Sequence, residues 1–303
     1  MKNHPPDFSD ISDSKHWRNI TFLDKGWSAD KKYYIETDVD KKLIIRLADI
    51  SQYEKKKTEY ETMQAIYRLG IDMSQPIDFG TCDSGKMVYI LLSWVEGESA
   101  EDTLSELNSL EQRNYGIAAG QILKKIHSVS APENQPSWES RITRKVEMKM
   151  SQYRNCGYAV PNDGKMMNFI NNNLQYLRDM PQTLQHGDFH PGNLIITQHN
   201  TLAIIDFNRI DFGDPYEEFV RVTTFTKNIS IPFAIGQING YFGKRAPELF
   251  FRLMALYSAI DAHFGIIWAI PFGQDDIEKS LIRSKSVFED YRGFETYVPL
   301  WYS

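Results

Sequence analysis

The chain has little of what secreted, membrane-spanning or disulfide-stabilised proteins need. It contains only two cysteines, Cys82 and Cys156, which are too few for a disulfide framework, so we expect a reducing, cytoplasmic location. The longest apolar candidate for a membrane span, residues 264–272, is short and contains Gly265 and Pro271, so we expect no contact with a membrane. The N-terminal residues lack the apolar segment of a secretion signal.

An excess of positive charge is also missing. The chain has 34 Lys and Arg against 40 Asp and Glu, a formal net charge of −6, and nucleic acid needs a basic face, so it is not an expected partner. The one basic run, Lys55–Lys57, is interpreted as a solvated helix face. The chain is 303 residues long, with 42% hydrophobic and 13% aromatic residues. This composition is typical of an ordered globular protein with two lobes or domains. Nothing in the sequence indicates an oligomeric state.

A β-hairpin is predicted after residue 193. The apolar runs 194–196 and 202–205 flank a polar stretch at 198–201, which is a hairpin pattern. If the turn centres on residues 199–200, Asn193 lies opposite Asp206, and directly opposed residues have Cα atoms about 4.5 to 5.5 Å apart. An amide oxygen and a carboxylate that close together suit Mg²⁺, which also keeps waters and binds substrate phosphates.

Asp188 lies in the same neighbourhood. It precedes Asn193 by five residues, across a bend at residues 191–192, and is free to act as a base. His186 and His190 are four residues apart and could suggest zinc. However, Pro and Gly at residues 191–192 break any helix that would align them, and no Cys or third His lies nearby, so a zinc site is disfavoured.

These residues form a string with a family resemblance. His186 to Asn193 reads HGDFHPGN, residues 204–207 read IIDF, and Gly-Asp-Pro follows at 213–215. This pattern resembles the aminoglycoside phosphotransferase and choline kinase family, with His-Gly-Asp in place of the His-Arg-Asp of protein kinases. The resemblance implies Asp188 as the catalytic base, Asn193 and Asp206 as metal ligands, and ATP and Mg²⁺ as cofactors.

The resemblance also implies a fold class. We expect an α+β, bilobal protein-kinase-like fold with a β-rich N-terminal lobe at residues 1–95. A helical C-terminal lobe at residues 96–303 would carry the catalytic loop and the acceptor site. Strands are predicted at 33–37, 42–47 and 88–92, and helices at 53–69, 112–127 and 250–268.

Arg46 departs from the family pattern. The strand after the phosphate loop normally carries a Lys that pairs with the nucleotide and with a Glu of the next helix. Arg46 has apolar neighbours on both sides, and an unpaired guanidinium there would be costly. Glu59 shares the buried side of helix 53–69, so we expect it to pair with Arg46. The resemblance makes other nucleotide neighbours plausible: Gly26 and Ser28 through backbone N–H groups, and Ser93 and Val95 where the third strand leads into the inter-lobe hinge.

The expected activity is ATP-dependent transfer of a phosphoryl group to a hydroxyl of a small molecule. Acidic residues beyond the metal ligand favour a cationic acceptor such as an aminoglycoside-type antibiotic: Asp211, Glu217, Glu218 and Asp261. Macrolide, choline-like, sugar or amino alcohol acceptors stay open. Arg46 and the single glycine of the phosphate loop favour the alternative of a kinase-like binding protein with weakened chemistry. A protein kinase is disfavoured, because seven residues between Asp206 and Asp214 leave little room for an activation segment.

Overall fold

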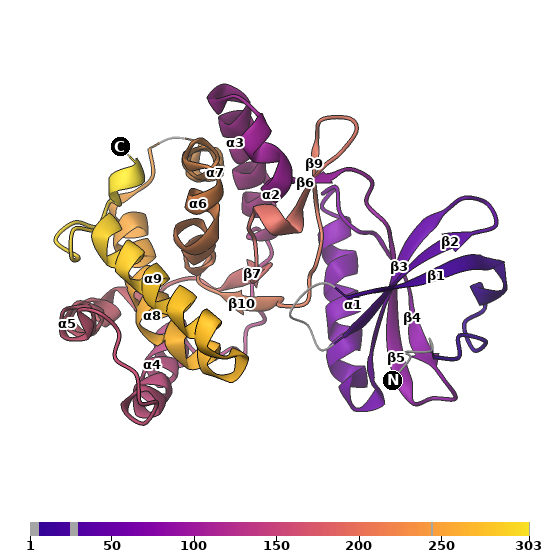
Figure 1. Ribbon diagram of the computed structural model, residues 1–303, viewed down its shortest axis with the longest axis horizontal. Coiled ribbons are helices and arrows are strands. Elements are labelled where there is room, and N and C mark those ends of the chain that lie inside the picture. Colours follow the sequence, from indigo (N-terminus) through magenta and orange to yellow (C-terminus); the bar gives the residue numbers. More distant parts are fainter. Residues whose placement is uncertain (1–5, 25–29, 244, 303) are drawn as a thin grey trace. The chain divides into compact units, whose positions relative to one another are not determined.

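The structure is a computed structural model that describes residues 6–24, 30–243 and 245–302 (Figure 1). The contacts divide the chain into two compact units, residues 1–100 with 193–210, and residues 101–192 with 211–303. The first unit is rich in strands and the second in helices, as the sequence predicts. The predicted division at residue 95 assigned the hairpin to the second lobe, whereas the contacts assign it to the first unit.

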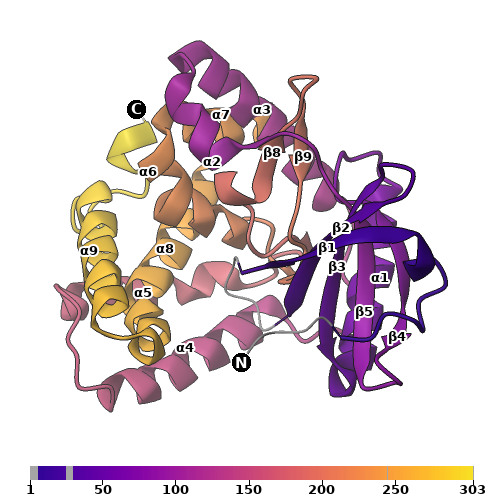
Figure 2. The same ribbon diagram turned by 45° about the vertical axis from the view of Figure 1, so that its right-hand side comes forward.

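An antiparallel sheet forms the centre of the first unit. Its strands are β1 Trp17–Leu23, β2 Lys31–Thr37, β3 Lys42–Asp49, β4 Pro76–Cys82 and β5 Met87–Ser93, in the order β1-β2-β3-β5-β4. Helix α1, Tyr53–Tyr67, packs on β4 and β5 (Figure 2). Successive side chains of a strand point to opposite faces. Tyr33 and Ile45 therefore belong to the apolar cluster of one face, while Lys32 and its cross-strand partner Arg46 lie on the other.

The predicted hairpin is present, but its register differs from the prediction. Strands β8 Leu194–Ile196 and β9 Leu202–Ile204 pair Leu194 with Ile204, and the short strand β6 Glu98–Ser99 adds to β8. The turn contains three residues, 198–200, and its last residue has a φ of 57°, a common arrangement for loops of this length. The prediction assumed two turn residues. Asn193 consequently opposes Ile205, whose N–H donates to its carbonyl oxygen at 3.1 Å, and Asp206 follows one position later.

Helices make up most of the second unit. They are α2 Ala100–Thr103, α3 Ser109–Ile126, α4 Trp138–Arg154, α5 Asp163–Asn173, α6 Lys227–Ile229, α7 Ile231–Phe242, α8 Glu248–Ala269 and α9 Gln274–Asp290. Strands β7 Thr183–Gln185 and β10 Asp211–Gly213 form an antiparallel pair. A π-helical turn covers Val222–Thr226, and shorter 3₁₀ turns of this unit lie at Leu104–Glu106, Leu174–Leu177, Glu217–Phe219, Ile270–Phe272 and Leu300–Tyr302. The 3₁₀ turns Ser14–His16 and Ile50–Gln52 belong to the first unit, and Pro191–Asn193 lies where the chain passes from the second unit to the first.

Helix α8 supplies much of the core of the second unit. Within Glu248–Phe272, the helix with the turn that follows it, an 18-residue window has a mean hydropathy of 1.5, and the segment's length and composition would allow it to cross a membrane, yet 72% of that window is buried in the protein. A helix that is apolar on all sides is expected where it is surrounded by protein. Its residues contact α4, α5 and α9, so α8 is the core helix around which this unit packs.

Helices α3 and α7 approach each other through glycines. Gly116 and Gly120 on α3 meet Gly236 and Gly240 on α7, and a Cβ added to any of the four would overlap a backbone carbonyl of the other helix. Small residues spaced four apart let two helix backbones come into direct contact. The close packing therefore depends on the absence of side chains at these positions.

Gly120→Ala is expected to destabilise the protein. The new methyl group would overlap the carbonyl oxygen of Gln237, so α3 and α7 must separate, and overpacking of this kind costs about 1 to 3 kcal/mol. Thermal unfolding should show a midpoint several degrees lower. Gly164→Ala in α5 is the matched control, because its added Cβ meets nothing within 4 Å. An equal loss in both variants would contradict the packing account.

Candidate active site

Arg46 and Glu59 form the predicted ion pair. Arg46 lies on β3 with 3% of its side chain exposed, and its Nη1 donates to Glu59 Oε1 on α1 at 2.6 Å. The pair is within the first unit, on the sheet face opposite to the apolar cluster. The prediction that Glu59 faces inward and neutralises Arg46 is confirmed. The fork of the guanidinium leaves further N–H groups for a second anion.

Two further side chains join this pair, and the sequence interpretation missed both. Lys56 is buried, not part of a solvated face, and donates from Nζ to Glu59 Oε2 at 2.9 Å and to Asp30 Oδ2 at 2.6 Å. Asp30 Oδ2 also accepts Arg46 Nη2 at 2.6 Å. Burial raises the pKa of Asp30, but the charges of Arg46 and Lys56 outweigh burial and leave that pKa below its ordinary value. Helical spacing was the available signal, because Lys56 precedes Glu59 by three residues.

Asp206 keeps one carboxylate oxygen without a partner. Its Oδ2 accepts Lys32 Nζ at 3.1 Å, while its Oδ1 is buried and makes no hydrogen bond to any residue that the structure describes. Its φ of 63° is unusual for a residue other than glycine. A buried carboxylate oxygen without a donor is costly unless a cation binds it. This observation fits a divalent metal ion held by Asp206 together with the amide oxygen of the half-buried Asn193.

A cluster of protein ligands that could bind a metal ion without phosphate is absent from the described part of the chain. No group of three His, Cys, Asp or Glu side chains there could hold a metal. Mg²⁺ commonly takes only one or two protein oxygens and completes its shell with waters and phosphates. The donor set of Asp206 and Asn193 is therefore the kind that needs a nucleotide to become complete.

In the second unit, Glu218 anchors the loop that carries Asp188. Glu218 accepts the backbone N–H of His186 at 3.0 Å and that of Gly187 at 2.6 Å, and His127 Nε2 lies 3.0 Å from its Oε2. Burial raises the pKa of Glu218, but the hydrogen bond and charge of His127 outweigh it, so the pKa is lowered. The sequence predicts Glu218 as an acceptor contact; in the structure its side chain is buried and both carboxylate oxygens accept N–H groups of the loop.

Asp188 itself is flanked by two nitrogen-bearing side chains. Arg221 Nε lies 3.2 Å from Asp188 Oδ1, and Arg221 Nη2 donates to the carbonyl oxygen of Gly187 at 3.2 Å. His190 Nε2 lies 3.8 Å from Asp188 Oδ2, and the His190 ring stacks on Phe225 at 5.0 Å. These contacts orient a half-buried carboxylate. A carboxylate held in this way can accept a hydrogen bond from a hydroxyl and then take its proton.

The other predicted acceptor residues have cationic neighbours. Asp211 is exposed and accepts Arg141 Nη2 at 2.7 Å, and Glu217 Oε1 lies 3.9 Å from Lys145 Nζ. Burial and the charge of Lys145 lower the pKa of Lys149, while the charge of Asp261 opposes them. The carboxylates that the sequence grouped as an acidic surface are thus partly neutralised by Arg141, Lys145 and Lys149.

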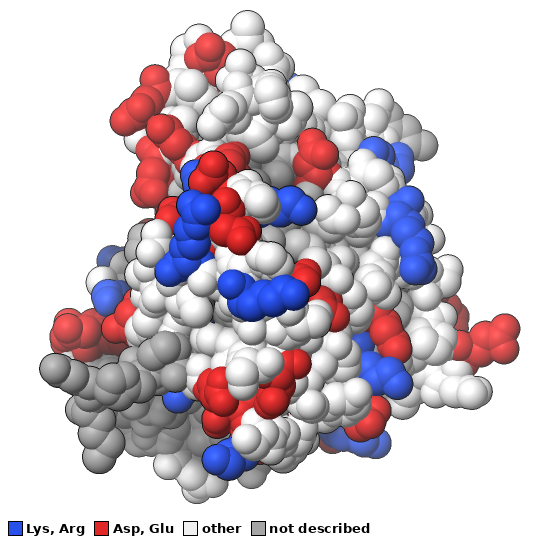
Figure 3. Space-filling view, turned by 90° about the vertical axis from the view of Figure 1, so that its right-hand side faces the viewer, with Lys and Arg blue, Asp and Glu red and all other residues white. Residues whose placement is uncertain are grey.

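The remaining predicted nucleotide contacts lie in the first unit. Ser93 ends β5, and its Oγ accepts the N–H of Gln75 at 2.8 Å. Val95 is half-buried two residues later, after the exposed Trp94, whose ring meets Tyr34 edge-on at 4.9 Å. Gly26 and Ser28 lie outside the described residues. Acidic and basic side chains are interspersed on the face drawn in Figure 3.

Asp214, in the Gly-Asp-Pro segment, is a structural brace. It is fully buried, accepts the Tyr216 N–H at 2.9 Å and the hydroxyl of Tyr257, and its own carbonyl accepts Gln185 Nε2 at 2.7 Å. Burial raises the pKa of Asp214 to about 7. Asp214 therefore ties the segment that leads to Glu218 to α8 through its carboxyl group and to β7 through its backbone carbonyl.

The raised pKa of Asp214 predicts a pH dependence of stability. A carboxyl with a folded-state pKa near 7 binds its proton more tightly when folded, so its stabilising contribution is complete below the unfolded pKa, near 4. This contribution is lost as pH rises through 7. Asp214→Asn should flatten the pH dependence of the unfolding free energy between pH 4 and 8, measured by urea denaturation. An unchanged slope would contradict the assignment.

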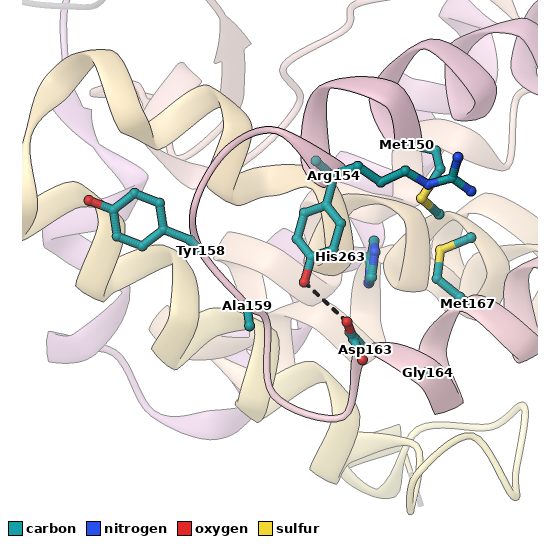
Figure 4. A pocket seen from close by; sticks show the side chains of 9 residues that line it. Met150, Arg154, Tyr158, Ala159, Asp163, Gly164, Met167 and His263 are labelled. Atoms are coloured by element: carbon teal, nitrogen blue, oxygen red, sulfur yellow. Dashed lines mark hydrogen bonds between the residues drawn. The ribbon is translucent and has the colours of Figure 1, made fainter.

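A separate cavity lies in the second unit (Figure 4). Its volume is about 360 Å³, and its lining comes from the end of α4, the loop after it, the start of α5 and the middle of α8. His263 belongs to this lining, is buried, and finds no hydrogen-bond partner for either ring nitrogen among the described residues. Burial lowers the pKa of His263 to about 4. None of the predicted site residues lines this cavity.

Comparison with known proteins points to one family. The model of the phosphotransferase enzyme family matches residues 19–251, whereas no curated protein sequence matches. A thermostable mutant of aminoglycoside phosphotransferase APH(4)-Ia, solved without ligand, has a TM-score of 0.66 at 16% identity and covers 91% of this chain and 96% of its own.

Two further solved structures have the same fold. The amicoumacin kinase hAmiN, in complex with AMP-PNP, Ca²⁺ and Ami, has a TM-score of 0.65 at 13% identity, with 94% of this chain and 91% of its own covered. The gentamicin complex of APH(2")-IIa has a TM-score of 0.65 at 16% identity, and the match covers 98% of this chain and 100% of its own. At such identities the likeness shows the fold, and the expected α+β, protein-kinase-like fold class is confirmed.

Proposed function

The chain belongs to the phosphotransferase enzyme family, and on that premise we propose that it transfers the γ-phosphoryl group of ATP to a hydroxyl group of a small molecule. The observation that carries the proposal is the buried, unpartnered Oδ1 of Asp206 in the unit that also holds the Arg46–Glu59 pair. A buried carboxylate oxygen that has no donor and a guanidinium that can receive phosphate are the two features that a metal–nucleotide complex needs.

Each group then has a definite task. Arg46, held by Glu59, binds phosphate oxygens of the nucleotide, and Asp206 and Asn193 hold the metal ion. The ion, when bound, neutralises charge on the phosphates during transfer. Asp188 orients the acceptor hydroxyl and takes its proton, and Glu218 keeps the loop of Asp188 in place through two backbone N–H groups. The protein contributes mainly positioning and charge.

The acceptor is the finer part of the proposal. Gentamicin is bound in the similar APH(2")-IIa structure, and hygromycin B is bound with ADP in a structure of a thermostable APH(4)-Ia mutant that also resembles this chain. A cationic acceptor was the expectation from the acidic residues. In this chain Asp211 pairs with Arg141, Glu218 is buried, and Glu217 has Lys145 nearby. We therefore place neutral or zwitterionic hydroxylated compounds ahead of polycations, because a polycation would meet these basic side chains.

An acceptor screen tests the function. ATP consumption with Mg²⁺ would be measured against polycationic aminoglycosides, neutral sugars and macrolides, and zwitterionic or choline-like alcohols. Asp188→Asn serves as the control for turnover that does not use the site. Acceptor-dependent ATP consumption in the parent protein supports a kinase. Nucleotide binding without turnover on any acceptor class would favour the kinase-like binding protein.

A further inference from the structure

Four charged side chains of the first unit form a closed ring. Arg46 and Lys56 supply two positive charges, and Glu59 and Asp30 supply two negative charges. Each cation contacts both anions, at distances between 2.6 and 2.9 Å, and the exposed fraction of each side chain is 9% or less. The ring is therefore buried and carries no net charge before any nucleotide binds.

We propose that Lys56 is a second phosphate-binding cation and that the carboxylate of Asp30 occupies the phosphate position until nucleotide replaces it. This inference rests on the proposed function and adds two residues to it. Asp30 Oδ2 receives both Arg46 Nη2 and Lys56 Nζ at 2.6 Å. Asp30 Oδ2 thus lies between two cationic nitrogens, which is the arrangement that also binds a phosphate oxygen through charge-assisted hydrogen bonds.

The charge balance explains why only one of the two anions can stay. A phosphate added beside Asp30 and Glu59 would give three anionic groups around two cations, and buried like charges repel strongly. Glu59 is fixed on α1, where it holds both Arg46 and Lys56. Asp30 stands just before β2, outside regular structure. Asp30 is therefore the group that gives way to phosphate.

Arg46 has a further N–H group to offer. Its Nε is buried and has no hydrogen-bond partner among the described residues, although Nη1 and Nη2 are both engaged. An unsatisfied donor in a buried site costs free energy that an added acceptor recovers. A phosphate, with more oxygens than a carboxylate, can satisfy donors that Asp30 leaves unpaired.

Substitution of Asp30 should change phosphate affinity in opposite directions, depending on whether Asp30 occupies the phosphate position or only holds Arg46 in place. Asp30→Asn removes the competing charge and keeps the shape, so calorimetry should show ATP and inorganic tripolyphosphate binding roughly tenfold tighter, the order expected for one charge beside phosphate. Weaker binding of both would mean that Asp30 positions Arg46, and would overturn the proposal. Asp40→Asn, an exposed site of the same unit with a φ of 58° that Asn tolerates, controls for net charge.

A Lys56 variant tests whether Lys56 binds phosphate. Lys56→Gln should weaken the binding of ATP and of tripolyphosphate by roughly tenfold, again the order expected for one charge beside phosphate. An unchanged affinity would exclude Lys56 as a phosphate-binding cation. The double variant Asp30→Asn with Lys56→Gln leaves the balanced Arg46–Glu59 pair, so it should fold and should bind less tightly than Asp30→Asn alone. Thermal unfolding of each variant confirms that the fold is intact.

Tripolyphosphate separates this inference from the proposed function. If the parent protein consumes no ATP on any acceptor but tripolyphosphate binding tightens in Asp30→Asn, the proposed kinase activity is refuted, whereas the assignment of the Asp30 carboxylate to the phosphate position is supported. If ATP is consumed but neither Asp30 nor Lys56 changes phosphate affinity, the kinase stands and the inference fails.

Discussion

Asp188→Asn is expected to lower kcat by about 10² to 10⁴-fold, the range typical of general-base assistance. The substitution preserves the shape of the side chain and its contact with Arg221, but the amide cannot accept the proton of the acceptor hydroxyl. Nucleotide affinity should stay within a few-fold of the parent value, because the groups proposed to bind ATP and metal lie in the first unit and Asp188 lies in the second.

Steady-state kinetics with the acceptor found by the screen, together with calorimetric titration of ATP, separate the two effects. Asp179→Asn is the matched control: it removes one exposed carboxylate of the same unit, at a position whose φ of 57° suits Asn. A near-parental kcat for Asp188→Asn would show that Asp188 is not the base. A parallel loss of ATP affinity would show that the substitution disturbs more than proton transfer.

The elements that carry the site follow from local patterns in the sequence. Strands β2, β3 and β5 show apolar and β-branched runs, and α1 shows apolar residues at helical spacing. The Arg46–Glu59 pair was predictable for a physical reason, since a buried guanidinium needs a carboxylate and Glu59 shares the buried face of α1. The hairpin between Asn193 and Asp206 was predictable from its two apolar runs.

The hairpin register was not predictable from those runs alone. Turns of two and three residues both fit the polar stretch, and the choice depends on Asn200 adopting a left-handed conformation. A one-residue change in register moves every side chain of one strand to the other face. The sequence placed Asn193 and Asp206 in the same neighbourhood, but it could not set their pairing.

Contacts between residues far apart in the sequence could not be predicted either. Lys56 looked like part of a solvated run, because its partner Asp30 is 26 residues away. Glu218 looked like an acceptor contact for the same reason: the backbone N–H groups that it binds lie 32 and 31 residues earlier. Charge alone does not tell whether a carboxylate faces solvent or satisfies buried donors, so tertiary contacts decided both roles.

Asp206→Ala is expected to remove the metal dependence of nucleotide binding and to weaken ATP binding by roughly 100-fold or more, since even residues that only support a metal ligand affect affinity by 10 to 100-fold. Asp206 offers the one buried, unpartnered carboxylate oxygen among the described residues, so no neighbouring group can replace it. The variant also releases Lys32, whose Nζ lies 3.1 Å from Asp206 Oδ2.

Calorimetric titration of ATP with Mg²⁺ and with EDTA distinguishes the role of Asp206 as a metal ligand from its role as the ion-pair partner of Lys32. The parent protein should bind ATP much more weakly in EDTA, and Asp206→Ala should bind equally weakly in both conditions. Asp72→Asn, an exposed carboxylate in the same unit, should behave like the parent. If the parent binds ATP equally well with and without EDTA, Asp206 serves as the partner of Lys32 and not as a metal ligand, because an ion pair between side chains does not respond to a chelator.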